Sequence, residues 1–401
     1  MKHLILALDL GTSLTKCLYQ VDDGPLRLLT VPPDAVELSR TLESVVTTQC
    51  DAIDAFRSAG AENLIWYTPT KDSSRLFVAG SLASKFQEGV DIKQLKYEVA
   101  EFKIVGIVGV IAQRERFGNE RFLLDIALLL PHGEYRDGEQ LKDQVARVLS
   151  GRDGFYWHGT QSVRAKLGEW RFYPEGSGRI FRYMQKEGKA AVRSHNLLIL
   201  MLGHRNGSIL ALEQGRDSEE SESSDKYGFY RFLEYILEVK SGYSPEDLMK
   251  GITAQDSNGD GTRYFIDPRK VAELRNRNSD NIEREAAEIQ AAIEAAHLRY
   301  INGITRWIES KQRVFNADKF LFCGGACLLF REELEAFAIS DGRPDPVGVF
   351  TESIDPEQDP AVEELSTELH LSHHDRQTLG YRLVDIYSLF KDVTSKERQY
   401  G

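Results

Sequence analysis

Two stretches of the chain share one pattern of apolar and polar residues. Residues 197–212, LLILMLGHRNGSILAL, are two apolar runs joined by the polar turn 203–207, and residues 6–18, LALDLGTSLTKCL, have the same order. Each pattern predicts two strands joined by a glycine-led turn. A shift of 192 positions superimposes five identical pairs: Leu6 and Leu198, Leu8 and Leu200, Leu10 and Leu202, Gly11 and Gly203, Leu18 and Leu210. Because the pattern occurs in both halves of the chain, we expect a duplicated fold whose two turns face each other across a cleft.

A third apolar run ends in small residues. Residues 319–330, KFLFCGGACLLF, predict a strand that runs into Gly324, Gly325 and Ala326, and helix-favouring residues follow at 331–337. Small residues at a strand-to-helix turn let the backbone approach a flat ligand such as a nucleoside.

Three further stretches have apolar residues at helical spacing. Residues 227–242 predict a helix, and residues 280–312 predict either one long helix or a pair broken near Gly303. We expect His297 to lie on a face of that helix rather than to bind a metal. Residues 379–393, LGYRLVDIYSLFKDV, predict an amphipathic helix that packs on the first domain.

The composition limits the possible partners. The chain has 401 residues, of which 41% are hydrophobic, enough for two globular domains or one duplicated fold. A formal net charge of −12 argues against broad electrostatic binding of DNA or RNA. Asp9 interrupts the apolar start, and no later run approaches the ~20 apolar residues of a membrane span, so we expect a cytoplasmic protein that binds no membrane.

The cysteines favour a reducing compartment. There are four, too few and too scattered for a disulfide framework. Cys323 and Cys327 lie close together, but without a further Cys or His pair they fall short of the four ligands of a structural zinc site. We interpret them as small buried residues beside a turn.

The first turn carries groups suited to a phosphate chain. The backbone N–H groups of Gly11, Thr12 and Ser13 would form an anion-binding nest, to which the hydroxyl groups add donors. Asp9 can hold a hydrated Mg²⁺ near the phosphates, and Lys16 supplies a positive charge. The alternative is a plain hairpin in which Asp9 and Thr12 stabilise the turn.

In their order along the chain, these three segments resemble the phosphate-1, phosphate-2 and adenosine motifs of the actin, heat-shock chaperone and sugar-kinase superfamily. The nearest likeness is to the ParM/StbA-like bacterial actins, whose first motif, Gly-Ser/Thr-x-x-x-Lys, is matched by residues 11–16. FVAGSLASKF at 77–86 resembles their Val-Gly-x-x-Ala segment, and YPEG at 173–176 resembles their Pro-Glu element. The likeness covers most of residues 1–330.

The resemblance implies an α/β fold, namely an actin-like duplicated ribonuclease-H-like fold with two domains around a nucleotide cleft. It implies ATP or GTP with Mg²⁺ as cofactors and a slow Mg-dependent ATPase or GTPase activity. It places Asp9 by the metal, Lys16 by the β-phosphate, and Glu175 where it would orient or polarise the water that attacks the γ-phosphate. The alternative for Glu175 is a helix start, with Pro174 at the first helical position ahead of residues 178–188.

The second turn departs from the family pattern. Met201 stands where the family normally has an acid, so one group expected to bind the metal-bound water is missing. We interpret the turn as a phosphate clamp, against the alternative of a hairpin whose His204 and Arg205 face solvent. The residues of this clamp are Gly203, His204, Arg205, Asn206 and Ser208. We therefore expect nucleotide binding with slow or absent hydrolysis.

Two polar stretches have competing interpretations. Residues 256–267, DSNGDGTRYFID, place acids near the positions of a calcium loop, but Asp267 is not the usual Glu and Arg263 occupies a normally apolar place. The alternative is a polar connecting loop, and Asp267-Pro268 favours the start of the next helix. Residues 216–226, RDSEESESSDK, predict a solvated, mobile loop, with a regulated interaction site as the alternative.

We expect a first domain of residues 1–175, completed by the helix 379–393, a second domain of residues 176–340, and a C-terminal extension of residues 341–401. The resemblance further implies head-to-tail self-association into filaments. Filaments of this type segregate plasmids through an adaptor protein linked to DNA, or organise the cell.

Two other functions remain open from the sequence. A small-molecule kinase of the same superfamily would need a carboxylate base, for which Asp125 and Asp153 are candidates. A nucleotide-gated scaffold that neither polymerises nor hydrolyses is the other, and Met201 favours it.

Overall fold

The computed structural model describes residues 1–55, 60, 65–86, 96–151, 154–256, 262–276, 279–340 and 354–400. By their contacts they form two compact units, one of Met1–Pro174 with Leu389–Gly401 and the other of Glu175–Ser388. The chain thus passes from one unit to the other at two places. The bounds expected from the sequence differ from this division in the C-terminal part, because residues 354–388 pack with the second unit.

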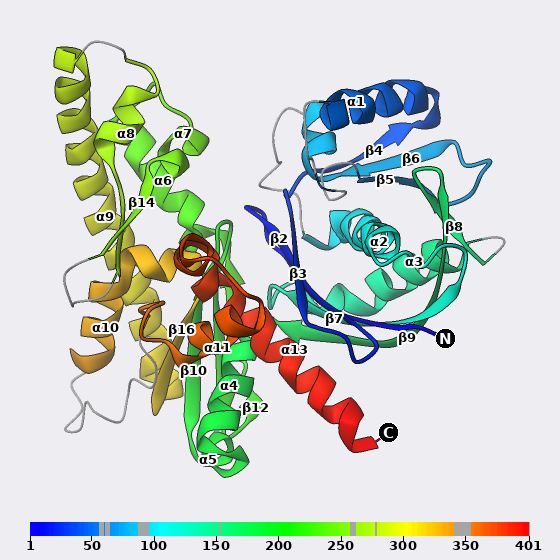
Figure 1. Cartoon of the computed structure of the whole chain (residues 1–401). Coiled ribbons are helices and arrows are strands. Elements are labelled where there is room, and N and C mark those ends of the chain that lie inside the picture. Colours follow the sequence, from blue (N-terminus) through cyan, green and yellow to red (C-terminus); the bar gives the residue numbers. More distant parts are fainter. Residues whose placement is uncertain are drawn as a thin grey trace. The chain divides into compact units, whose positions relative to one another are not determined.

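The first unit is built on one large mixed sheet. In the described residues this sheet has nine strands, in the order β3-β2-β1-β7-β9-β8-β5-β6-β4. The strands are β1 (His3–Leu10), β2 (Thr15–Val21), β3 (Arg27–Val31), β4 (Ala35–Ser39), β5 (Ile65–Thr68), β6 (Arg75–Ala79), β7 (Arg121–Leu130), β8 (Tyr156–His158) and β9 (Gln161–Pro174). The helices are α1 (Glu43–Ala55), α2 (Lys96–Arg114) and α3 (Gly138–Ser150). The sheet curls around α2 and α3 (Figure 1).

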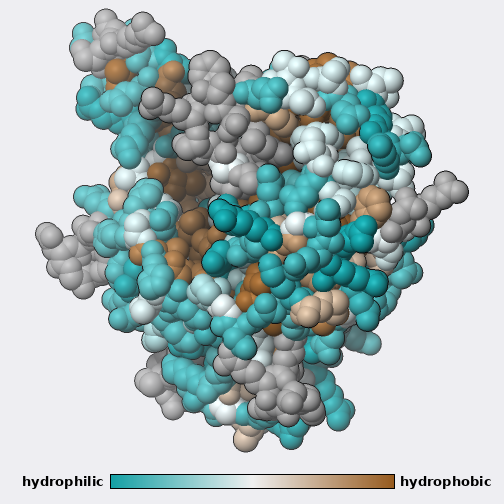
Figure 2. Space-filling view, turned by 45° about the vertical axis from the view of Figure 1, so that its right-hand side comes forward, coloured by the Kyte–Doolittle hydropathy of each residue, from teal (hydrophilic) through white to brown (hydrophobic). Residues whose placement is uncertain are grey.

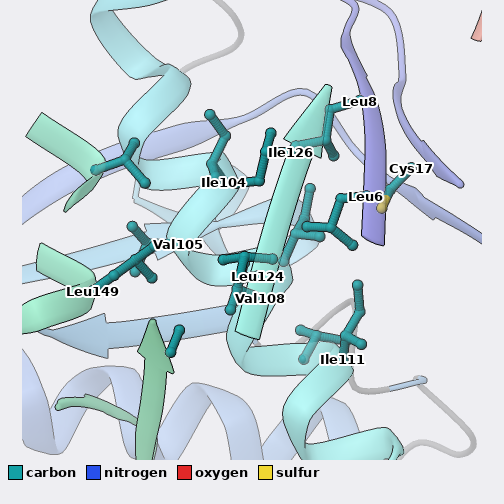
Figure 3. Close-up of a cluster of buried hydrophobic side chains, with 14 of the residues drawn as sticks. Leu6, Leu8, Cys17, Ile104, Val105, Val108, Ile111, Leu124, Ile126 and Leu149 are labelled. Atoms are coloured by element: carbon teal, nitrogen blue, oxygen red, sulfur yellow. The ribbon is translucent and has the colours of Figure 1, made fainter. Parts of the chain in front are cut away.

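The central strand β1 is buried on both faces. It pairs antiparallel with β2 and parallel with β7, and residues Leu4 to Leu10 are all buried. A strand with parallel neighbours and both faces covered has a nearly continuous apolar sequence, which explains the run LILAL. On one face, Leu6 and Leu8 pack with Ile104 and Val108 of α2 (Figure 3).

Two glycines let α2 approach the sheet closely. A Cβ on Gly106 would lie 2.5 Å from Ile65 Cγ2, and a Cβ on Gly109 would lie 2.3 Å from His158 Cδ2. Helix α2 therefore touches β5 and β8 with its backbone, at a separation that any larger residue would prevent.

The second unit repeats the core of the first on a smaller scale. In the described residues its main sheet has the order β12-β11-β10-β16, with β13 also paired to β11, and β14 pairs with β15 in a separate ribbon. The strands are β10 (Asn196–Leu202), β11 (Gly207–Glu213), β12 (Arg216–Asp217), β13 (Glu222–Ser224), β14 (Ile252–Asp256), β15 (Thr262–Ile266) and β16 (Lys319–Cys323). The helices are α4 (Ser177–Glu187), α5 (Lys189–Ser194), α6 (Phe229–Val239), α7 (Pro245–Lys250), α8 (Pro268–Glu273), α9 (Ser279–Phe315), α10 (Arg331–Ser340), α11 (Pro360–Glu368) and α12 (His373–Asp375). Helix α13 (Tyr381–Tyr400) begins in this unit and ends in the first.

The duplication predicted from the sequence is present in the topology. In the first unit, β1 pairs antiparallel with β2 and parallel with β7. In the second unit, β10 pairs antiparallel with β11 and parallel with β16. Both predicted hairpins are therefore real, and each lies beside a parallel third strand.

The predicted helices are found with two differences. Helix α9 is continuous from Ser279 to Phe315 through Gly303, so the alternative of a broken pair is wrong. We expected the helix at 379–393 to pack on the first domain, but α13 belongs by contacts to the second unit up to Ser388 and to the first unit only from Leu389.

The prediction of a mobile loop at residues 216–226 is wrong. This segment contains β12 and β13, and the Ser221 hydroxyl accepts a hydrogen bond from the Ala211 N–H at 2.9 Å. Lys311 of α9 pairs with Glu222 at 2.9 Å, and the Trp307 indole N–H donates to the same carboxylate. These contacts order a segment whose composition alone indicated disorder.

Figure 2 shows one face on which hydrophilic side chains predominate, with smaller hydrophobic areas. Among the helices described, none combines the length and apolarity needed to cross a bilayer.

Burial of His158 makes the stability of the first unit dependent on pH. Burial lowers the pKa of His158 from 6.5 to about 4, so below pH 6.5 the unfolded chain takes up a proton that the folded chain does not. Stability is therefore lost as the pH falls from 6.5 towards 4. We expect this residue to contribute a loss of about 2 kcal/mol between pH 7.5 and pH 5.

The measurement is urea unfolding followed by tryptophan fluorescence at both pH values. His158→Gln should abolish this share of the pH dependence, whereas His374→Gln, at an exposed site, should leave it in place. An equal pH dependence in wild type and His158→Gln would contradict the prediction.

Candidate functional site

The first hairpin turn is tight and requires glycine. It comprises residues 11–14 and is closed by the pair Leu10–Thr15, next to which lies the pair Asp9–Lys16. A Cβ on Gly11 would lie 2.5 Å from the Leu14 carbonyl oxygen, so the turn has no room for a side chain there. In the same turn, Thr12 is half-buried and Ser13 is exposed.

A buried ion pair lies beside this turn. Lys16 Nζ is 2.5 Å from Asp9 Oδ2, and the side chains are 10% and 8% exposed. The two residues face each other across β1 and β2, so the hairpin register itself brings them together. Because both ions are buried, removal of either one would leave the other without compensation. A phosphate at this place could pair with Lys16, and a metal ion with Asp9.

Asp125, the candidate base of a kinase, has a structural role instead. Its Oδ2 lies 2.6 Å from His3 Nε2, and its Oδ1 accepts a hydrogen bond from the Glu169 N–H at 2.6 Å. The register between β7 and β9 shifts at this point, so Asp125 holds an irregularity in the sheet. It pairs in register with Ile5, four residues before Asp9 along β1. Asp153 lies outside the described residues.

The second hairpin turn is bound to the start of α6. The Gly203 and His204 carbonyl oxygens accept hydrogen bonds from the N–H groups of Phe229 (2.9 Å) and Tyr230 (2.8 Å). A Cβ on Gly228 would lie 1.8 Å from the Arg205 carbonyl oxygen, so glycine permits this contact. The first amides of α6 are thus used within the protein, and an anion would have to be held by the turn's own N–H groups and side chains.

The side chains of this turn are less exposed than a plain hairpin requires. Arg205 is only 9% exposed, so the alternative in which it faces solvent is wrong. Burial and the nearby charge of Arg382 lower the pKa of His204 to about 4, against the opposing effect of Glu246. His204 is therefore neutral at pH 7 and offers a donor without positive charge. The Ser208 hydroxyl shares a hydrogen bond of 2.9 Å with Ser223.

The third predicted segment lies directly against the second turn. Strands β10 and β16 pair Met201 with Cys323, so both strands end at the same edge. Gly324 has φ 89°, and a Cβ on it would lie 2.3 Å from the Leu202 carbonyl oxygen. The segment Gly325–Phe330 continues as a 3₁₀ helix, η6, that includes Ala326.

Glu175 lies near the same strand ends. It is 2% exposed and immediately precedes Gly176, which has φ 95°. A Cβ on Gly176 would lie 3.1 Å from Ile199 Cγ2 and 3.8 Å from Cys323 Sγ, which places this turn beside β10 and β16. The expected helix start at Pro174 is wrong, because Pro174 ends β9 and α4 begins at Ser177.

The second unit thus gathers Glu175, the turn 203–206 and Gly324–Ala326 within one region. A residue that the sequence analysis missed joins them: Arg382 of α13, whose Cγ would be 3.1 Å from a Cβ on Gly325. The residues of the first turn belong to the other unit.

A second missed feature is a buried ion pair behind Glu175. Arg179 Nη1 lies 2.8 Å from Asp359 Oδ2, and the two side chains are 1% and 0% exposed. The guanidinium also lies 4.7 Å from the centre of the Tyr381 ring, whose hydroxyl donates to the Phe322 carbonyl oxygen at 2.8 Å. Arg179 lies 180 positions from Asp359, so no pattern of neighbouring residues predicts their ion pair.

The two cysteines behave as buried small residues. The Cys327 thiol donates to the Cys323 carbonyl oxygen at 3.0 Å, and burial raises the pKa of both thiols. Over the described part of the chain, no cluster of three or more His, Cys, Asp or Glu is placed to hold a metal. Within the candidate calcium loop 256–267, residues 257–261 lie outside the described residues. Thr262–Ile266 form β15 rather than a polar connecting loop, and Asp267 caps α8 as expected from Asp267-Pro268.

A separate cavity of about 1090 Å³ lies between α9, β15 and η6. Its lining includes Tyr264, His297 and Phe330, and His297 pairs with Glu333 at 2.6 Å. None of the predicted site residues lines it.

The repeated hairpin with its parallel third strand defines the duplicated, ribonuclease-H-like architecture of the actin-like fold. No family model and no curated protein matches this chain. Solved structures of actin homologues match it over nearly its whole length.

Three of these structures illustrate the likeness. The actin-like protein Alp7A is 14% identical, with 99% of this chain and 98% of that chain covered and a TM-score of 0.55. The archaeal actin homolog Ta0583 is 12% identical, with 98% and 99% covered and a TM-score of 0.53. A 15-stranded ParM filament from Clostridium botulinum is 13% identical, with 98% and 100% covered and a TM-score of 0.53. The chain has the two-domain actin-like fold, and the resemblance to ParM-like actins is confirmed at the level of the fold.

The buried pair behind Glu175 predicts a large effect of a single substitution. Arg179→Met would leave the Asp359 carboxylate buried beside an apolar side chain, which costs about 3 kcal/mol in the free energy of unfolding. Urea or thermal unfolding measures the loss.

The matched control lies one turn further along α4. Arg182 pairs with Glu364 at 2.8 Å, where the side chains are 19% and 46% exposed, so Arg182→Met should cost less than about 1 kcal/mol. Equal losses for the two variants would show that burial of the Arg179 pair is unimportant.

Proposed function

We propose that this chain binds ATP or GTP with Mg²⁺ and assembles into actin-like filaments when the nucleotide is bound. The observation that carries the proposal is the buried Asp9–Lys16 pair beside a glycine-led turn, in an actin-like fold that repeats the hairpin in its second unit. One of the structural neighbours is a ParM filament, which supports self-association.

The residues present fit a nucleotide-bound Mg²⁺ better than a metal held by protein alone. Mg²⁺ keeps several waters and usually binds one or two carboxylates together with substrate phosphates. Asp9 supplies one carboxylate, and the described residues contain no larger ligand cluster. The metal would neutralise phosphate charge, as it does in other nucleotide sites.

Each turn has groups suited to binding phosphate oxygens. In the first turn, Lys16 would exchange its ion pair with Asp9 for one with a phosphate. The amides of Gly11, Thr12 and Ser13 would donate hydrogen bonds to phosphate oxygens. In the second, the donors are those of the turn 203–206, in which Arg205 carries the positive charge. Gly324, Gly325 and Ala326 would lie against the nucleoside, where the lack of large side chains gives space.

Hydrolysis would be slow and would depend on Glu175. A buried carboxylate accepts a hydrogen bond from the attacking water and orients it. Met201 occupies the position where a second acid would hold the metal-bound water, and it is buried against the strand end. Because Glu175 is present and the second acid is replaced by Met201, we expect nucleotide hydrolysis to be slow compared with other actin-like proteins.

The filament would serve plasmid segregation or cell organisation. A heterologous contact between identical subunits that does not close produces an open filament. The net charge of −12 makes direct binding to DNA unfavourable, so a basic adaptor protein would link the filament to DNA.

A second candidate, the nucleotide-gated scaffold that does not polymerise, is favoured by Met201 alone. The kinase alternative has lost its described candidate, because both carboxylate oxygens of Asp125 are used within the first unit.

Nucleotide-dependent assembly is the first test. Light scattering should rise when ATP or GTP with Mg²⁺ is added to the purified protein, and phosphate release should follow slowly. Glu175→Gln should lower phosphate release by about a hundredfold, because the water loses its orienting carboxylate, while assembly is retained. Nucleotide binding without scattering or phosphate release would favour the scaffold.

Lys16 provides the second test. Lys16→Met should weaken nucleotide affinity by tenfold or more, since a hydrogen bond to a charged group contributes about 1.5–3 kcal/mol. Isothermal titration gives the dissociation constant, with Lys71→Met, an exposed lysine of the same unit, as the control of equal charge change. Equal affinities in the two variants would exclude Lys16 from the phosphate site.

A further inference from the structure

The helix that follows Glu175 is capped by a residue distant in the sequence. Asp385 of α13 accepts a hydrogen bond from the Gly176 N–H on Oδ2 (2.8 Å) and another from the Gly178 N–H on Oδ1 (2.7 Å). These are two of the amides at the start of α4, and Gly176, at the cap position, has no side chain to serve them. A negative charge also suits the positive end of a helix.

The contact is close and buried. Asp385 is 9% exposed, and a Cβ on Gly178 would lie 1.9 Å from the Asp385 carbonyl oxygen. The backbones of α4 and α13 therefore touch at Gly178. This leaves Asp385 little freedom to move relative to the amides that it binds.

The two amides lie directly after Glu175 in the chain. Gly176 has φ 95°, and because glycine has no Cβ, its backbone can adopt many other conformations once its hydrogen bond is removed. On the other side of the turn, Arg179 is fixed by its ion pair with Asp359. Asp385 therefore helps to hold the short segment between Glu175 and the first turn of α4.

We propose that Asp385 is a positioning residue for Glu175. The inference rests on the proposed function, in which Glu175 orients the attacking water. Asp385 does not touch the nucleotide in this proposal. It fixes the backbone at Gly176 and Gly178 and thereby the position of the Glu175 carboxylate. A displacement of a catalytic group by about 1 Å costs up to a hundredfold in rate, so the effect falls on turnover rather than on binding.

The test is kcat and KM for phosphate release in Asp385→Asn. The amide has the size of the carboxylate but places an NH₂ group against one of the two N–H donors, so one hydrogen bond is lost. We expect kcat to fall by about tenfold or more, with nucleotide affinity within about twofold of wild type. Ser388→Ala on the same helix is the control: this side chain is 2% exposed, and its hydroxyl has no hydrogen-bond partner among the described residues.

A double variant separates positioning from a general loss of stability. In the Glu175→Gln background, Asp385→Asn should lower kcat no further, because the group that it positions is already gone. A further loss in the double variant, or a rise in KM with kcat unchanged, would overturn the proposal. Should Asp385→Asn not fold, Gly178→Ala tests the same contact, since the added methyl separates α4 from α13 without removing a polar group.

Failure of the proposed function would look different. If Glu175→Gln hydrolyses nucleotide as fast as wild type, or wild type does not hydrolyse it, the role of Glu175 fails and the positioning role of Asp385 fails with it. If Glu175→Gln is inactive and Asp385→Asn retains the wild-type kcat, only the role of Asp385 is refuted.

Discussion

Burial of both faces of the central strand in each unit governs where polar chemistry can lie. β1 and β10 each have a parallel neighbour on one side and an antiparallel one on the other, and their side chains are buried over nearly the whole length. A polar group in the middle of such a strand would need a partner in the core, so charged residues are placed at the strand ends and in the turns that follow. Asp9 and Met201 occupy the same position before those ends in the two halves.

The duplicated halves have diverged at one cross-strand pair. In the first unit the register joins Asp9 to Lys16, and in the second the equivalent positions hold Met201 and Ser208. The first hairpin has two opposite charges at this pair, whereas the second has none there and carries its positive charge in the turn itself, on Arg205.

The fold followed from local signals, and much of the site did not. The hairpins, the glycine turns and the helices at 229–239 and 279–315 have periodic apolar patterns or turn residues, which a sequence shows directly. The pairs of Arg179 with Asp359 and of Asp385 with α4 join residues about 180 to 209 positions apart, so no pattern of neighbouring residues predicts them. The same reason explains the error at 216–226, where the ordering partners are Trp307 and Lys311 on α9. Residue types alone indicated a solvated loop.

Each unit has a buried cysteine beside its turn. Cys17 pairs in register with Leu8 next to the first turn, and Cys323 ends β16 beside the second, and burial raises the pKa of both thiols. Protonated and covered, they can react with a thiol reagent only when the surrounding strands open. In a variant without Cys50 and Cys327, the separate labelling rates of Cys17 and Cys323 would therefore report the local opening of each unit.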